Sequence, residues 1–249
     1  NWQDYTVHDK VHPNKAGAEK MATVWFEALK KVLASSETVF SPEIVRYKTL
    51  EDGDSLALHI FKPRNMQAGE KRPAIVYFFG GGWKLGSPIQ FYRECAYYAS
   101  KGMIAVSVDY RIGYLHHSTP FESFEDAKDA ICWLRSHASD YQLDPDKIAV
   151  AGGSAGGHLA AALGTIGSDE TVPAGYRPNL SVLYYPVIDM VSRGYGFPEI
   201  KRDFEKISPI HHVSEATPST LILLGTKDPI VSVETIEAYQ DKLLQKGVD

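Results

Sequence analysis

The feature that most constrains this chain is a series of short apolar runs separated by segments with helical periodicity. The runs are continuous and, after the second, do not alternate with polar residues, which is typical of strands covered on both faces of a sheet. Most are separated by enough residues for a helical crossover, so the sequence predicts a largely parallel α/β sheet. The seven runs are residues 44–47, 56–61, 74–79, 103–108, 148–151, 180–185 and 220–224.

Local sequence patterns predict three further features. Asp52-Gly53 lies between the first two runs and predicts an antiparallel hairpin at the start of the sheet. The sequence TPFE at residues 119–122 combines a capping box with a proline at the first helical position and predicts the start of a helix. Apolar residues at spacings of three and four predict a separate amphipathic helix over residues 14–33.

Length and charge exclude several classes of protein. The chain has 249 residues, enough for one large domain and a smaller piece. Its formal net charge is −5 and it has no Lys/Arg cluster, so nucleic acid is not an expected partner. No apolar run approaches the roughly 18 residues that a membrane span needs. Cys95 and Cys132 cannot form a disulfide framework, and the compartment stays undecided, with a secreted or periplasmic location compatible with the sequence.

Ser154 is the strongest candidate for a catalytic residue. The sequence GGSAGG at residues 152–157 directly follows the run 148–151 and opens a helical stretch. Between a strand and a helix, G-x-S-x-G places the serine in a strained turn that exposes its hydroxyl above the sheet. The alternative is a glycine-rich turn that only lets the helix and strand pack closely. The context favours a nucleophile.

A second glycine motif, FGGGW at residues 79–83, follows the third apolar run. Backbone N–H groups that no side chain covers can stabilise the oxyanion formed in acyl transfer. We expect these donors to be the N–H groups of Gly81, Gly82 and Ala155. A phosphate loop is the alternative, but the sequence contains neither G-x-x-x-x-G-K-[ST] nor G-x-G-x-x-G.

Asp228 lies just past the last apolar run, in the sequence GTKDP. A Ser-His-Asp triad needs such a carboxylate to orient the histidine and to stabilise its protonated form. The chain order, serine before aspartate, favours this role over that of a simple turn former. Asp189 is the reserve candidate.

From about residue 40 to Asp249 the chain resembles α/β-hydrolases of the hormone-sensitive-lipase and acetyl-xylan or feruloyl esterase-like group. The resemblance rests on FGGGW, VDYR at residues 108–111, GGSAGGHLA and GTKDP, in this order. It implies an α/β-hydrolase fold with Ser154 as nucleophile and Asp228 as acid. It also implies hydrolysis of carboxylic esters, on small molecules or polysaccharides, without a metal or organic cofactor.

The sequence departs from that group in two places. Phe79 stands where the glycine motif usually begins with histidine, so a histidine contact to the loop is lost. In the group, the catalytic histidine follows the acid after one further helix and strand, but no histidine follows Asp228 here. We therefore expect the sheet to end before its last strand, the base to lie beyond residue 249, and this chain alone to be nearly inactive. A non-catalytic binding or scaffold domain and a prolyl-oligopeptidase-like peptidase are the alternatives.

The amino-terminal residues carry their own signature. DKVHPN at residues 9–14, followed by the predicted helix, resembles the final block of SGNH (GDSL-type) esterases, whose D-x-x-H motif supplies an acid and a base. The resemblance implies that Asp9 and His12 are remnants of such a site. The predicted domains are therefore residues 1–35, the tail of an SGNH-type esterase, and residues 36–249, a carboxyl-terminally incomplete α/β-hydrolase domain.

Four other side chains are weaker candidates. His158 lies one turn after Ser154 and is expected to pack structurally at the start of the helix. Large aromatic residues near the motifs could line an acyl pocket, with ordinary packing as the alternative. They are Trp83, Tyr195 and Phe197.

Overall fold

The structure, a computed structural model, describes residues 20, 23, 41–167, 174–190 and 203–249. The chain divides into two units, Asn1–Ser41 and Pro42–Asp249, and the sheet belongs to the second. Asp9, His12 and most of the helix predicted over residues 14–33 lie outside the described residues. The assignment of residues 1–35 to a separate domain therefore stays a prediction.

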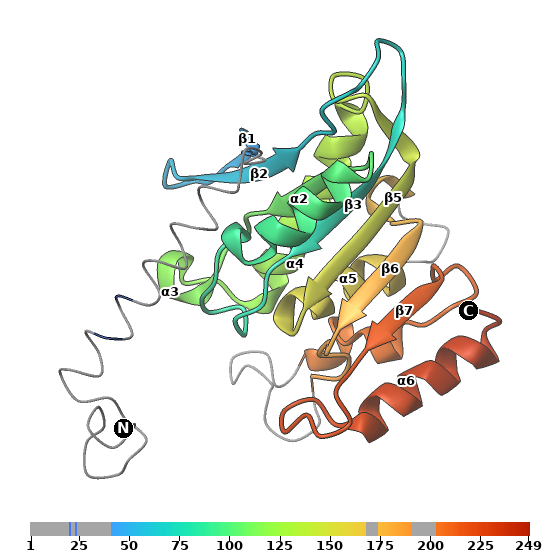
Figure 1. Cartoon of the computed structure of the whole chain (residues 1–249). Coiled ribbons are helices and arrows are strands. Elements are labelled where there is room, and N and C mark those ends of the chain that lie inside the picture. Colours follow the sequence, from blue (N-terminus) through green and yellow to red (C-terminus); the bar gives the residue numbers. More distant parts are fainter. Residues whose placement is uncertain (1–19, 21–22, 24–40, 168–173, 191–202) are drawn as a thin grey trace. The chain divides into compact units, whose positions relative to one another are not determined.

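The described part of the second unit contains one seven-stranded sheet with the order β1-β2-β4-β3-β5-β6-β7 (Figure 1). The β1–β2 and β2–β4 pairs are antiparallel and all other pairs are parallel. This confirms the largely parallel sheet and the antiparallel hairpin at its start. The bounds are β1 Glu43–Thr49, β2 Ser55–Phe61, β3 Arg72–Phe78, β4 Ile104–Val108, β5 Leu143–Gly153, β6 Leu180–Tyr184 and β7 Thr220–Leu223.

The helices connect these strands. The predicted capping box is present at the start of the helix after Thr119: Phe121 N donates to the Thr119 hydroxyl, and Glu122 accepts from Thr119 N. The helices are α2 Tyr92–Ser100, α3 Gly113–His116, α4 Pro120–Ser136, α5 Ala155–Thr165 and α6 Val233–Gln245. The short 3-10 helices are η2 Pro88–Phe91, η3 Ala174–Tyr176, η6 Phe204–Lys206 and η7 Pro209–His211.

The order of the strands reverses at β3, which lies between β4 and β5. The crossover from β3 to β4 therefore runs along the sheet in the opposite direction from the crossovers to β5 and β6. Because such crossovers are right-handed, α2 covers one face of the sheet, and α4 and α5 cover the other. In open α/β sheets, ligands bind outside the carboxyl ends of the strands at this kind of reversal. The reversal here lies between β3 and β5.

Helix α5 explains why the residues after Ser154 are small. It contacts β3, β5 and β6, and every one of its residues is buried. Glycine and alanine keep its backbone close to the sheet, so the start of α5 lies directly over the carboxyl end of β5. This is the local geometry that places residue 154 at the edge of the sheet.

Strand β7 is the last strand of the described sheet, and α6 lies next to it (Figure 1). Thr220 N, at the start of β7, donates a 2.8 Å hydrogen bond to the carbonyl of Asp249. No helix in the described part of the chain combines the length and the apolar character that crossing a membrane would require.

Candidate active site

Ser154 occupies the turn between β5 and α5 with φ 53° and ψ −118°, a conformation that is strained for a residue with a side chain. Its N–H donates to the carbonyl of Tyr184 at 3.0 Å, and its carbonyl accepts from His158 N at 2.9 Å. These bonds tie the turn at Ser154 to β6 and to α5. The serine is half-buried at the carboxyl edge of the sheet.

The two glycine motifs are in direct contact. A Cβ atom on Gly80 would lie 2.9 Å from the carbonyl oxygen of Gly153 and 3.5 Å from Cβ of Ser154. A Cβ atom on Gly156 would overlap the carbonyl oxygens of Phe78 and Phe79. Glycine is therefore required at both positions by the close approach of the loop after β3 to the turn after β5.

Two of the expected N–H donors, Gly81 and Gly82, directly follow Gly80 in the loop that makes this contact. Gly81 and Gly82 have φ values of 134° and 61°, so their peptide groups turn away from the direction of β3. In the part of the chain that the structure describes, neither of their N–H groups donates to another protein group. Ala155 is the first residue of α5, and its N–H group therefore has no acceptor within the helix. The three expected donors thus belong to the two segments that meet beside Ser154, and their role stays a prediction.

Asp228 lies in the loop between β7 and α6. One carboxylate oxygen, Oδ1, accepts hydrogen bonds from the N–H groups of Ile230 and Val231 at 2.8 and 2.9 Å. These bonds fix the orientation of the carboxylate. Strand β7 is two strands away from β5, which corresponds to about 10 Å. Asp228 and Ser154 therefore both follow the carboxyl ends of parallel strands, two strands apart in the sheet.

His158 packs in the core, as the sequence predicted. Its ring is completely buried, its Nε2 lies 2.7 Å from the carbonyl of Ile207, and its edge contacts Trp83 with the ring centroids 5.0 Å apart. Burial lowers the pKa of His158 to about 4. Trp83 is only 1% exposed, which agrees with the packing role that the sequence left open.

Of the remaining predicted site residues, only Asp189 lies in the described part of the chain. Tyr195, Phe197, Asp9 and His12 all lie outside the described residues. Asp189 follows β6 and lines a narrow crevice with Pro186, Ile230 and Thr235. Within the described ranges, no three His, Cys, Asp or Glu side chains gather in a way that could hold a metal ion.

Two contacts to the glycine loop were not predicted from the sequence. The Tyr110 hydroxyl donates to the carbonyl of Phe79 at 2.6 Å, and the Gln90 side-chain oxygen accepts from Gly80 N at 2.5 Å. Tyr110 belongs to the VDYR motif, which was recognised without a role for the tyrosine. Gln90 is an exposed residue of the short 3-10 helix η2 and matches no motif, so no signal in the sequence singles it out.

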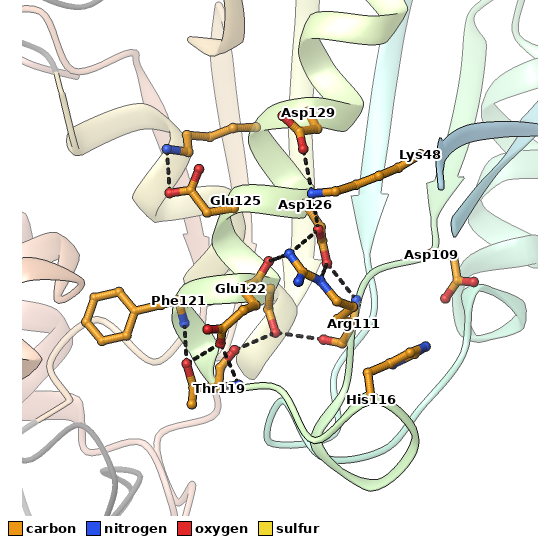
Figure 2. A network of polar contacts seen from close by, with 12 residues as sticks. Lys48, Asp109, Arg111, His116, Thr119, Phe121, Glu122, Glu125, Asp126 and Asp129 are labelled. Atoms are coloured by element: carbon orange, nitrogen blue, oxygen red, sulfur yellow. Dashed lines mark hydrogen bonds and ion pairs between the residues drawn. The ribbon is translucent and has the colours of Figure 1, made fainter. Parts of the chain in front are cut away.

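The segment that carries Tyr110 is held by a buried carboxylate. Asp126 of α4 is completely buried, and it binds Arg111 through the backbone N–H, Nε and Nη2 at 2.8–2.9 Å (Figure 2). Lys48 of β1 adds a 2.6 Å ion pair. Burial raises the pKa of the adjacent Asp109 to about 6, and the nearby His116 opposes this rise. The network ties the end of β4 to α4 and β1.

A strained serine after β5, a glycine loop after β3 and an aspartate after β7, all at the carboxyl edge of a largely parallel sheet, are the features of an α/β-hydrolase esterase. The solved structure of esterase Est2 from the planctomycete Thermogutta terrifontis has this fold. It is 36% identical in sequence with a TM-score of 0.76, and the match covers 84% of this chain and 79% of that chain.

The model of the BD-FAE family matches residues 58–196. This is more than half of the sequence, and the chain belongs to the BD-FAE family of α/β-hydrolase esterases. Esterase LipC from Mycobacterium tuberculosis is 28% identical over 223 residues, which are 77% of this chain and 53% of LipC. The acylamino-acid-releasing enzyme of Arabidopsis thaliana is 29% identical over 222 residues, which are 78% of this chain and 28% of that enzyme. The chain spans about half the length of LipC and of two further curated relatives that it matches.

Proposed function

We propose that the protein is a serine hydrolase of carboxylic esters in which Ser154 is the nucleophile. The observation that carries this proposal is the strained turn at Ser154 with the glycine loop packed against it. Acyl transfer needs a strained, half-buried serine next to free backbone donors, and the loop against Ser154 carries two N–H groups, of Gly81 and Gly82, that donate to no acceptor in the described part of the chain. Membership of an esterase family supports the same reaction.

In the proposed reaction, Ser154 Oγ attacks the ester carbonyl while its proton passes to a histidine. The carbonyl oxygen becomes an oxyanion, which the N–H groups of Gly81, Gly82 and Ala155 stabilise. Collapse of this intermediate releases the alcohol, which takes the proton from the histidine, and leaves an acyl-serine. Water then repeats the sequence and releases the acid. Asp228 orients the histidine and stabilises its protonated form.

We further propose that this histidine lies outside the 249 residues. No histidine follows Asp228 in the sequence, and the buried ring of His158 is bound to Ile207. Loss of the base from a Ser-His-Asp triad costs about a million-fold in kcat. The 249-residue chain alone should therefore be nearly inactive, and a polypeptide that also contains the histidine should be active.

The substrate class we favour is esters of short acyl groups. The solved structures of Thermogutta terrifontis Est2 include complexes with propionate and with butyrate, and this supports short acyl chains for a related site. Acetyl or feruloyl groups on carbohydrate, including polysaccharide, are the narrower alternative. An acylamino-acid substrate is the second candidate, because one curated relative is an acylamino-acid-releasing enzyme.

The decisive experiment compares Ser154→Ala with a matched control, Ser136→Ala, which removes an exposed hydroxyl on α4. In the full-length protein, Ser154→Ala should abolish hydrolysis of p-nitrophenyl acetate, and Ser136→Ala should leave it unchanged. Paraoxon should add one diethyl phosphate group, located on Ser154 by peptide mass spectrometry. Hydrolysis that survives Ser154→Ala would refute the proposed nucleophile.

The same assay separates the alternatives. Turnover of p-nitrophenyl butyrate or acetate without release of p-nitroaniline from acetyl-alanine p-nitroanilide supports an esterase, and Ser154-dependent release of p-nitroaniline supports a peptidase. Full activity of the 249-residue chain would show that the base lies within it. Absence of any Ser154-dependent turnover or labelling in the full-length protein would favour a non-catalytic binding domain.

A further inference from the structure

The loop at residues 79–83 has a backbone conformation that must be held by its surroundings. Gly81, Gly82 and Trp83 have consecutive positive φ values of 134°, 61° and 57°. For tryptophan this conformation is strained, and such residues persist only where neighbouring groups hold them. Hydrogen bonds from Lys84 N and Leu85 N to the Gly81 carbonyl close the end of the loop. They do not determine how the loop leaves β3.

The exit from β3 is determined by one peptide group, the one between Phe79 and Gly80. Its carbonyl oxygen accepts a 2.6 Å hydrogen bond from the Tyr110 hydroxyl, and its N–H donates a 2.5 Å hydrogen bond to Gln90 Oε1. The oxygen and the hydrogen of a trans peptide point in opposite directions. The two side chains therefore hold the same plane from its two sides, and rotation of the plane would break both bonds.

Tyr110 is well suited to this task. It is completely buried, and its ring stacks on Phe79 with the centroids 4.1 Å apart and the planes 15° apart. Burial raises its pKa, so the hydroxyl keeps the proton that it donates to Phe79. Its position is fixed in turn by the neighbouring Arg111, which Asp126 binds through three nitrogen atoms (Figure 2).

Gln90 completes the arrangement from the other side. It lies in η2, which follows the loop after Gly86, and its side-chain oxygen faces Gly80 because a backbone N–H can only donate. A Cβ atom on Gly86 would come within 2.5 Å of the Gly80 carbonyl, so the chain folds back closely onto the loop before it reaches Gln90. The Gln90 side chain thus contacts Gly80, at the start of the loop that precedes Gln90 in the sequence.

We propose that Gln90 and Tyr110 are positioning residues for the oxyanion donors, acting through the peptide group between Phe79 and Gly80. The inference rests on the proposed function, since it gives a purpose to the N–H groups of Gly81 and Gly82. A fixed peptide plane at the start of the loop sets the directions of the next two planes, which carry those N–H groups. Preorganised donors of this kind act on the transition state and not on substrate binding.

The test uses Gln90→Met and Tyr110→Phe, singly and together, in the full-length protein. Each substitution removes one hydrogen bond and keeps the approximate shape of the side chain. The matched controls remove the same kinds of bond elsewhere: Asn179→Leu removes a side-chain oxygen that accepts from Ile148 N, and Tyr176→Phe removes a hydroxyl that donates to the Ile166 carbonyl.

Two measurements are made on each variant. The first is hydrogen exchange at the Gly80 amide, which should become faster in Gln90→Met. The second is kcat and KM for p-nitrophenyl acetate, per active site titrated with paraoxon. Each single variant should lower kcat by about tenfold with KM within about twofold, less than the 10²–10³-fold cost of losing an oxyanion donor outright. The double variant should lower kcat by less than the product of the two single effects, because both bonds hold one plane.

The outcomes test the positioning role of Gln90 and Tyr110 separately from the proposed esterase function. Unchanged kcat despite faster exchange, equal losses in the controls, or fully multiplicative effects in the double variant would each overturn the positioning role. If Ser154→Ala kept full activity, the proposed function would fail. The exchange of the Gly80 amide would still show whether Gln90 holds this peptide group.

Discussion

His158 shows how one buried side chain makes the stability of the fold depend on pH. Its ring is completely buried, and burial lowers its pKa to about 4, from about 6.5 in an unfolded chain. Between these two values, the unfolded chain binds a proton at His158 that the folded chain does not bind. Stability is therefore fully present above pH 6.5 and is lost as the pH falls towards 4.

The prediction concerns the slope of this dependence. The pKa shift of His158 corresponds to a loss of about 3 kcal/mol in the free energy of unfolding as the pH falls from 6.5 to 4. In His158→Gln, the free energy of unfolding should fall less steeply with decreasing pH over this interval, as measured by urea denaturation at a series of pH values. His211→Gln, at an exposed histidine, should keep the wild-type slope. Equal slopes in wild type and His158→Gln would contradict the assignment.

At the scale of elements, the Asp126 carboxylate links three parts of the fold: helix α4, strand β1 and the segment after β4. The carboxylate lies in α4, Lys48 lies in β1, and Arg111 lies in the segment between β4 and α3 (Figure 2). All contacts of Asp126 are charge-assisted and the carboxylate is buried, so removing it leaves the two cations without their shared buried partner.

We expect Asp126→Ala to destabilise the protein by about 3–5 kcal/mol, the usual cost of removing one partner from a buried ion pair. The control is Asp129→Ala, which removes the other carboxylate bound to Lys48. The side chain of Asp129 is 53% exposed, so this change should cost less than about 1 kcal/mol. Urea unfolding of both variants measures the difference, and similar losses would show that burial of Asp126 is not decisive.

The elements differ in how well the sequence predicts them. The inner strands β3, β4 and β5 are predicted because a strand buried on both faces leaves a continuous apolar run, and α4 because its cap is local. Helix α2 was not predicted: only Cys95 and Ala99 are buried among its residues, so the helix has no wide apolar stripe. The site follows the same rule. Ser154 lies in a local motif, whereas the partnership of Gln90 with Gly80 depends on the path of the chain between them.

At the scale of the whole molecule, β7 exposes apolar side chains at the end of the sheet. Leu221 and Leu223 are 54% and 45% exposed, and β7 pairs with β6 on its other side. An apolar strand at the end of a sheet is a template for association with another chain. The 249-residue chain should therefore self-associate at high concentration.

Replacing both leucines by lysine, in the double variant Leu221→Lys/Leu223→Lys, should raise the concentration at which this association begins by about tenfold, which is about 1.4 kcal/mol. Light scattering over a concentration series measures the change, and circular dichroism checks that the variant is folded. Leu115→Lys replaces another exposed leucine, far along the chain in α3, and should have little effect. Association that does not respond to the two lysines would place the contact elsewhere.

The position of β3 between β4 and β5 also has a consequence for synthesis of the protein. The glycine loop is made before β4 and α4, and Ser154 is made after them. At about 5–20 residues per second, the ribosome delivers the serine several seconds later than the loop. During that interval, the edge of β3 that will receive β5 stays open on the nascent chain. The glycine loop and the turn at Ser154 come together only when β5 closes that edge.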